Sequence, residues 1–368
     1  MIDRQVLTLV LLLSLAVSLL PACTKPTPRG PCLDGGPVPT ICGFENPEDI
    51  EWVPDAGLLV VSDLRMWNVK IPGGGFLSAL EPGSKEVWKI WPAGVPGDLA
   101  PEPAFGDPSC PGPPDPKAFF NHGLTSIPRG DGAILYVVGH RSDRGEGREA
   151  VEVFYLRGRG KEAKISWKGC IPTEEAIQAN DVAVAPDGEV IVSNYQPTGS
   201  PWHTIRSVML GRKTGDVMGW KALRGWRHVP NTEARQANGV AVSASGEWIF
   251  YAETGSGLVH RISSDGSPPH TTAKVGGNPD NLSWTSRGTL LVATHTGGAR
   301  FMGCANGRLP CRTSWAIHEI DPATMSEKRI LAHDGSLLGA VSAATEARGT
   351  IYLGSVFDDR IGVVPATP

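Results

Sequence analysis

One sequence pattern recurs six times along the 368-residue chain. Each copy opens on a polar or Gly-containing segment, continues as an alternating strand, turns, and ends in a second, apolar strand. The clearest copy is Asn180–Gly188 followed by Val190–Ser193, and a third strand often follows, as at Val151–Leu156. The copies begin at positions 48, 122, 180, 238, 280 and 339, so successive starts lie 42 to 74 residues apart.

This spacing predicts the architecture. A repeat of that length suits one four-stranded blade with loops of variable length. Six copies therefore predict an all-β fold, a six-bladed β-propeller. Gly and Pro together make up about a fifth of the chain, which fits short strands joined by turns. A double β-sandwich is the weaker alternative, because every copy has an equivalent polar start.

The composition excludes few functions. Hydrophobic residues make up 40% of the chain and charged residues 20%, which is typical of a folded chain with a large core. The formal net charge is −4. This slightly acidic balance argues against a nucleic-acid partner, which requires a basic surface.

The N-terminal segment is predicted to direct export. Val6–Leu20 is a charge-free apolar run of 15 residues, short for a membrane span and typical of a signal peptide. Leu20–Cys23 resembles the bacterial lipobox, in which the Cys becomes lipid-modified. We therefore expect a signal peptide over residues 1–22, lipidated Cys23 with a Pro-rich tether to residue 38, and a propeller over residues 39–368. The alternative is an ordinary signal peptide. Thr24 favours the periplasmic face of the outer membrane.

The remaining six cysteines predict disulfides. An even number in an exported chain suggests a disulfide framework, and six cysteines allow fifteen pairings. Proximity in sequence favours Cys32–Cys42 and Cys304–Cys311, which leaves Cys110–Cys170. No CxxC occurs, so a zinc site is not expected. The loop Pro92–Lys117, with nine Pro in 26 residues, could border the active site or be a passive insertion.

The repeat starts carry the candidate chemistry. The innermost strand of each blade lines the central channel of a propeller, so equivalent starts converge at one end of it. Two carboxylates and three amides in this set are oxygen donors, which suit Ca²⁺ and not zinc or copper. Each of them alone would be read as a turn former. The converging residues are Glu48, His122, Asn180, Asn238, Asp280 and Asn281.

With these residues, the chain resembles the paraoxonase (arylesterase/lactonase) family, part of a wider six-bladed group that includes the senescence-marker/gluconolactonase proteins. The resemblance runs from about Asn46 to Val363 and depends on the order of several short motifs. These are Pro47–Glu51, Asn121–Leu124, Leu135–His140, Val151–Phe154, Asn180-Asp181, Ala237–Gly239, Asp280-Asn281 and Leu291–His295.

The resemblance implies two calcium sites and a histidine pair. By position, a catalytic Ca²⁺ would be held by Glu48, Asn180, Asn238, Asp280 and Asn281. A structural Ca²⁺ would be held by Asp49, Asp181 and the carbonyl of Leu124. His122 and His140 match the family's His pair, and His295 matches a further His near the site.

The resemblance also shows departures. Ser193–Tyr195 stands where an acidic residue followed by His is expected, so support for the site there is in doubt. Ile361–Pro368 lacks the Cys that normally bridges to the N-terminal strand. Closure of the ring would then depend on hydrogen bonds.

We therefore expect a Ca²⁺-dependent lactonase or arylesterase, in which the metal polarises the carbonyl and His122, helped by His140, activates water. Asp280 is the alternative base. A non-catalytic Ca²⁺-stabilised propeller that binds a partner at the envelope is the first alternative, and a strictosidine-synthase-like condensation is the second. No GxSxG motif occurs, which disfavours a serine hydrolase.

Overall fold

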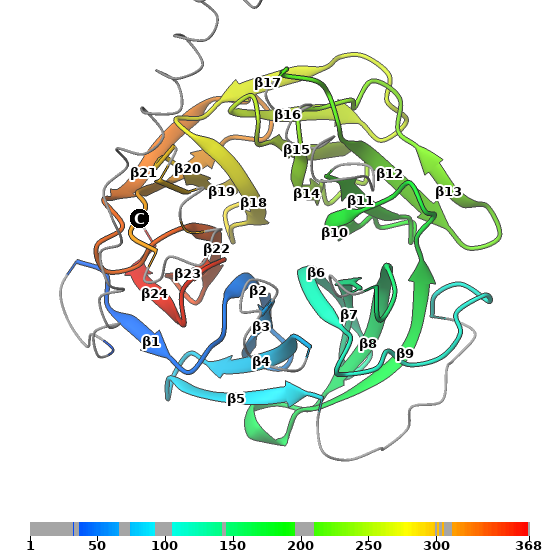
Figure 1. The fold of residues 1–368 in the computed structure, drawn as a ribbon, viewed down its shortest axis with the longest axis horizontal. Coiled ribbons are helices and arrows are strands. Elements are labelled where there is room, and N and C mark those ends of the chain that lie inside the picture. The colour runs from blue at the N-terminus through cyan, green and yellow to red at the C-terminus, as the bar shows by residue number, and fades with distance from the viewer. Residues whose placement is uncertain are drawn as a thin grey trace, which may run out of the picture. The chain divides into compact units, whose positions relative to one another are not determined.

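The computed structural model describes residues 32, 37–65, 74–92, 105–141, 145–195, 210–298, 300–301, 304 and 311–366. Within them, 24 strands form six antiparallel four-stranded sheets around a common centre (Figure 1). The prediction of an all-β six-bladed propeller is confirmed. The predicted signal segment, Cys23 and most of the tether lie outside the described residues. None of the helices in the described ranges is long and apolar enough to span a membrane.

The first three blades follow the chain from the innermost strand outward. The first contains β2 (Pro47–Val53), β3 (Leu58–Asp63), β4 (Phe76–Glu81) and β5 (Glu86–Trp91). The second contains β6 (Phe120–Arg129), β7 (Gly132–His140), β8 (Ala150–Arg157) and β9 (Lys164–Pro172), with the short 3₁₀ helix η1 (Gly160–Glu162) before β9. The third contains β10 (Ala179–Val184), β11 (Val190–Asn194), β12 (Asp216–Lys221) and β13 (Gly225–His228).

The last three blades repeat this order. The fourth contains β14 (Ala237–Val242), β15 (Trp248–Glu253), β16 (Leu258–Ser263) and β17 (Thr271–Lys274). The fifth contains β18 (Asn278–Trp284), β19 (Leu290–His295), β20 (Trp315–Ile320) and β21 (Glu327–His333). The sixth contains β22 (Val341–Ala347), β23 (Thr350–Ser355), β24 (Arg360–Pro365) and, as its outermost strand, β1 (Thr40–Cys42).

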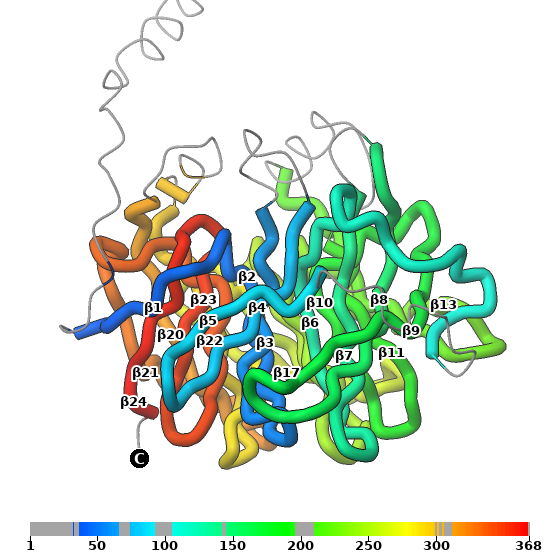
Figure 2. Tube along the Cα trace, turned by 90° about the horizontal axis from the view of Figure 1, so that it is seen from below, coloured from blue at the N-terminus to red at the C-terminus, as the bar shows by residue number. Residues whose placement is uncertain are grey.

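The ring is closed by the beginning of the described chain. β1 pairs with β24 in the register Thr40↔Gly362 and Ile41↔Ile361, so the last blade is completed by a strand from the other end of the sequence. Figure 2 shows β1 alongside β24. The ring is thus closed by main-chain hydrogen bonds between β1 and β24. The disulfide of Cys42 is local, because its partner is Cys32.

The hydrophobic core lies between the blades. Each of the six blade-to-blade interfaces contains one cluster of buried side chains, such as Leu77 and Phe154 between the first two blades. A middle strand is covered on both faces by its neighbours, and every residue of β3 is buried. An outermost strand such as β5 is partly exposed. This explains why the second strand of each repeat is apolar over most of its length.

The three predicted disulfides are present. Cys32–Cys42, Cys110–Cys170 and Cys304–Cys311 have Cα–Cα distances of 5.9, 5.4 and 5.2 Å, which suit a disulfide. Cys110–Cys170 ties the Pro-rich segment to β9. The backbone amide of Asp107 also donates to the carbonyl of Cys170, at 2.8 Å. The described part of this loop therefore lies against the outermost strand of the second blade.

Candidate functional site

The site is built from a backbone irregularity that all six innermost strands share. Near its start, each strand loses its regular register with the next strand, as between Asn121 and Leu124 of β6. A bulge of this kind adds a residue to one strand and changes the direction of side chains. The residues at these six bulges are Glu48, His122–Gly123, Asn180-Asp181, Asn238–Gly239, Asp280-Asn281 and Ser342.

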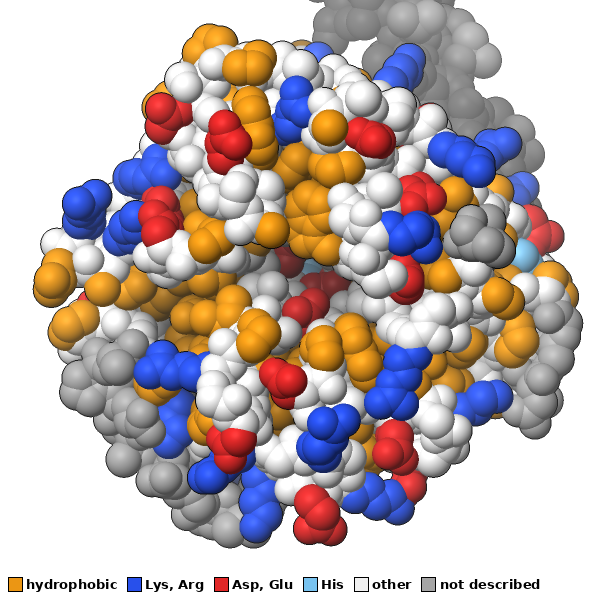
Figure 3. Space-filling view, turned by 180° about the vertical axis from the view of Figure 1, so that it is seen from behind, with side chains coloured by type: hydrophobic (Ala, Val, Ile, Leu, Met, Phe, Trp, Pro, Cys, Tyr) orange, Lys and Arg blue, Asp and Glu red, His pale blue; other side chains and the backbone are white. Residues whose placement is uncertain are grey.

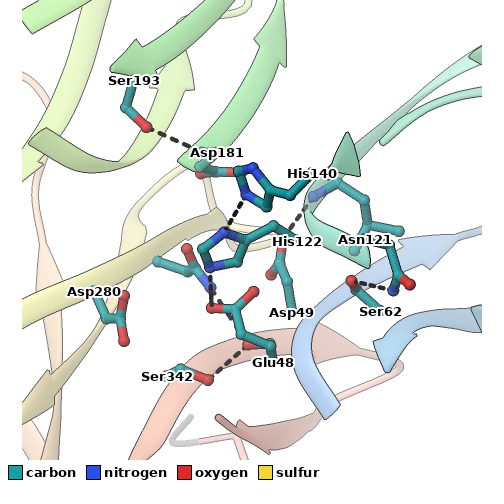
Figure 4. A network of polar contacts seen from close by, with 12 residues as sticks. Glu48, Asp49, Ser62, Asn121, His122, His140, Asp181, Ser193, Asp280 and Ser342 are labelled. Carbon is teal, nitrogen blue, oxygen red and sulfur yellow. Dashed lines mark hydrogen bonds and ion pairs between the residues drawn. The ribbon is translucent and has the colours of Figure 1, made fainter. Parts of the chain in front are cut away.

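Side chains from four blades meet at Glu48. The Nδ2 of Asn281 donates to Glu48 Oε1 at 2.8 Å, and His122 Nε2 lies 3.8 Å from the same oxygen. The hydroxyl of Ser342 donates to the backbone carbonyl of Glu48 at 2.6 Å. Figure 4 shows His122 above the Glu48 carboxylate. Convergence of the repeat starts is thus observed for these residues. Ser342, the sixth equivalent position, was not among the predicted site residues.

The predicted catalytic calcium ligands share a further property. Four of their side-chain oxygens are buried and have no hydrogen-bond partner among the residues that the structure describes. Buried polar atoms in folded proteins are nearly always paired. Unpaired oxygens from equivalent positions of four blades therefore fit a hard cation, and an irregular oxygen set suits Ca²⁺. The four oxygens are Glu48 Oε2, Asn180 Oδ1, Asn238 Oδ1 and Asn281 Oδ1.

The electrostatics of the cluster favour the binding of a cation. Burial raises the pKa of Glu48 well above its usual value, and the nearby charges of Asp49, Asp280 and Asp181 raise it further. The hydrogen bond from Asn281 opposes this rise. Within the described ranges, no three His, Cys, Asp or Glu side chains converge as a metal-binding group.

Asp49 and Asp181 form a second layer. Asp49 accepts backbone amides from Ile50 and Leu124, both at 2.8 Å, and Asp181 accepts those of Val182 and Val240, both at 2.7 Å. Each carboxylate thereby joins its own innermost strand to that of the next blade. Burial raises the pKa of Asp49 to about 6, although these hydrogen bonds oppose the rise.

The predicted structural calcium ligands thus lie near one another, but their observed bonds are to backbone amides. The group of Leu124 that contacts Asp49 is its amide. Asp49 and Asp181 also line a cavity of about 550 Å³ with Glu51, Trp52 and Trp284. In Figure 3, one end of the ring is hollowed at its centre, with acidic side chains in its depth.

The two predicted histidines contact each other. His122 Nδ1 lies 3.0 Å from His140 Nε2, with ring planes inclined at 64°. Burial lowers the pKa of His122 well below its usual value, and the proximity of His140 lowers it further, so His122 is neutral at neutral pH.

Glu149 extends the pair. Its Oε2 lies 2.7 Å from His140 Nδ1. Burial opposes ionisation of Glu149, but its bonds to His140 and the charge of His140 outweigh this and lower its pKa. Glu149 is not among the predicted site residues. The pairing of β7 with β8 places it opposite His140, and the nine-residue connection Arg141–Glu149 hides that register in the sequence.

Ser193–Tyr195, where the sequence departs from the paraoxonase pattern, also forms hydrogen bonds that hold neighbouring residues of the site. Ser193 Oγ accepts the backbone amide of Asp181, and Gln236 donates to the hydroxyl of Tyr195 at 2.7 Å. His295, matched by the resemblance, lies with its Nε2 2.6 Å from Asp280 Oδ2, and both side chains are buried. One oxygen of Asp280 is therefore already held by a neighbour.

Comparison with known proteins identifies the fold. A gluconolactonase from Xanthomonas campestris has a TM-score of 0.54 at 15% identity, over 93% of this chain and 99% of that chain. A luciferin-regenerating enzyme has a TM-score of 0.50 at 12% identity, over 88% and 92%. A Bacteroides thetaiotaomicron protein of unknown function has 0.54 at 8% identity, over 90% and 73%.

The likeness is one of fold. The protein is a six-bladed β-propeller. No protein-family model matches the chain, and no curated protein matches it in sequence. At these identities the shared architecture shows the scaffold, and the chemistry has to be argued from the side chains at its centre.

Proposed function

We propose that the protein is a Ca²⁺-dependent hydrolase of lactones or aryl esters. The observation that carries this proposal is the set of buried, unpaired oxygens beside a neutral histidine. Oxygen donors suit Ca²⁺, and a base next to a bound metal suits hydrolysis of a carbonyl compound. The fold likeness to a gluconolactonase supports a lactone as substrate.

The residues divide into two metal sites. Glu48, Asn180, Asn238, Asp280 and Asn281 would hold the catalytic ion. Asp49, Asp181 and Leu124 would hold a second, structural ion. Bound Ca²⁺ supplies a Lewis acid for the substrate carbonyl and its developing oxyanion.

His122 is the proposed base. Because its pKa is low, its ring is neutral and accepts a proton from water at Nε2. His140, 3.0 Å from the other ring nitrogen, fixes the plane of the imidazole. Asp280 is the less suitable base, since one of its oxygens is bonded to His295.

The test is hydrolysis of a panel of aliphatic lactones and phenyl acetate, with Ca²⁺, after chelation, and after Ca²⁺ is restored. We expect turnover that disappears and returns with Ca²⁺. His122→Gln should lower kcat by about 100-fold or more and keep Ca²⁺ affinity. Turnover that survives chelation would contradict the metal role. If chelation lowers thermal stability but no substrate is hydrolysed, the non-catalytic binding propeller becomes the better interpretation.

We further propose that Cys23 anchors the protein to the envelope. The support is the apolar run Val6–Leu20 followed by the lipobox-like Leu20–Cys23. Cys23→Ala should abolish incorporation of labelled fatty acid into the protein. Equal labelling of this variant and the wild type would contradict lipidation.

A further inference from the structure

A largely buried carboxylate, that of Glu149, contacts the histidine pair on the side away from Glu48. The ladder between β7 and β8 pairs Gly139 with Ala150, so His140 and Glu149 face each other at the end of the hairpin. Their side chains are only 5% and 11% exposed, and the Oε2–Nδ1 distance is 2.7 Å. Glu149 Oε1 accepts the backbone amide of Arg141 at 3.1 Å. Both carboxylate oxygens are thus engaged, which fixes the orientation of Glu149.

This arrangement determines where the protons are. An ionised carboxylate only accepts hydrogen bonds, so Nδ1 of His140 must carry a proton. With the Nδ1 proton held by Glu149, the other ring nitrogen of His140, Nε2, is the one that can accept the Nδ1–H of His122, 3.0 Å away. His122 is left with a lone pair on Nε2, the nitrogen that lies 3.8 Å from Glu48. The bonds of Glu149 therefore assign the tautomers of both rings.

We propose that Glu149 is a positioning residue for the proposed hydrolysis, holding His140 and, through it, His122 in the tautomer that exposes the basic nitrogen to the site. The inference depends on the proposed function only for its effect on rate. The contacts run in one line, from Glu149 to His140 at 2.7 Å and from His140 to His122 at 3.0 Å.

The chain contains a matched control. In the fourth blade, Glu253 Oε2 lies 2.8 Å from His260 Nε2, and His260 Nδ1 lies 2.8 Å from His270 Nε2. Glu253 Oε1 also accepts a backbone amide, that of Arg235. This network has the same three groups in the same order, but it ends at the exposed His270. Glu253→Gln therefore makes the same chemical change in a different blade from the histidine pair His122–His140.

The experiment compares Glu149→Gln, Glu149→Asp and Glu253→Gln in the full chain with Ca²⁺. We expect Glu149→Gln to lower kcat for lactones by about 10- to 100-fold, the usual effect of removing a group that orients a ligand or base. KM, Ca²⁺ affinity and thermal stability should remain near the wild-type values. Glu149→Asp, which retains a carboxylate, should recover part of the rate, and Glu253→Gln should retain wild-type kcat.

A second readout is independent of turnover. The ¹⁵N shifts of the histidine ring nitrogens report the tautomers directly. We expect wild-type His140 to be protonated at Nδ1 and to lose this preference in Glu149→Gln. Retention of kcat and of the His140 tautomer in Glu149→Gln would overturn the inference. If the wild-type protein hydrolyses no lactone, the proposed function fails, and the nitrogen shifts alone then support or overturn the role of Glu149.

Discussion

At the scale of single residues, the centre of the propeller combines buried negative charge with oxygen atoms that have no hydrogen-bond partner in the described part of the chain. Glu48 and Asp280 supply carboxylates, and the amides of three asparagines supply neutral oxygens. The sequence predicted these donors because they occupy equivalent positions in the repeats. It did not predict the groups that hold them, since Asp280–His295 and His140–Glu149 are contacts between neighbouring strands whose register depends on loop length.

Asp280→Asn tests the charge of the metal site. The amide preserves the shape of the side chain and can still accept a hydrogen bond from His295, but it removes one negative charge. We expect Ca²⁺ affinity to fall at least about 10-fold, measured by calorimetry. Asp265→Asn makes the same change at an exposed turn and should retain wild-type affinity. Equal affinity of the two variants would remove Asp280 from the ligand set.

Asp63 links stability to pH. It is fully buried, and it accepts hydrogen bonds from the hydroxyl of Ser78 at 2.6 Å and from the amide of Glu45. Burial raises its pKa from 3.8 to about 8, although both hydrogen bonds oppose the rise. The folded state therefore binds more protons than the unfolded state between these values. The contribution of Asp63 to the free energy of unfolding is fully present below pH 3.8 and is lost as pH rises through about 8.

Asp63→Asn should remove this dependence. We expect the free energy of unfolding, measured with urea at several pH values between 4 and 8, to fall less steeply with pH in the variant than in the wild type. The difference in unfolding free energy by which the variant falls below the wild type should be smallest at the upper end of this pH range. Parallel pH profiles for the two proteins would show that Asp63 does not titrate in this window.

At the scale of the strand, the bulges that form the site also set how closely the innermost strands approach. Gly239 follows Asn238 in the bulge of β14, and a Cβ there would lie 2.5 Å from the carbonyl oxygen of Asp280. The positions of the strands could be predicted from the alternation of apolar residues and from the turns. The bulges could not be predicted, because a bulge is a property of two paired strands. Outermost strands such as β13 and β17 are also harder to predict from the sequence, because their partial exposure weakens the apolar pattern.

Gly239→Ala should therefore destabilise the contact between the fourth and fifth blades. The clash is with the backbone of Asp280 and Asn281, which cannot move away without disturbing the site. We expect a loss of roughly 1–3 kcal/mol in unfolding free energy, the usual cost of overpacking. Gly83→Ala is the control, because an added Cβ there meets nothing within 4 Å. Similar urea midpoints for the two variants would contradict a close approach at this bulge.

At the scale of the whole ring, six repeats predicted six blades, but the residues that close the ring are a weak sequence signal. β1 contains only three residues, too few for a recognisable alternation. In the structure its Ile41 is 9% exposed and packs in the cluster between the sixth and first blades. Without β1, β24 would present an unpaired edge, and such edges promote association between chains.

Ile41→Asp tests whether this strand closes the ring. A buried, unpaired charge is costly, so the variant should favour detachment of β1 and exposure of β24. Val87→Asp is the control: Val87 is partly buried and packs against the same cluster, but it lies on β5, the outermost strand of a blade built from one continuous segment. Both variants should unfold at lower urea concentrations than the wild type. Only Ile41→Asp should increase self-association in sedimentation velocity experiments, because only this change uncovers a strand whose partner comes from the far end of the chain. If Ile41→Asp sediments like Val87→Asp, then the pairing of β1 with β24 is not what protects the open edge.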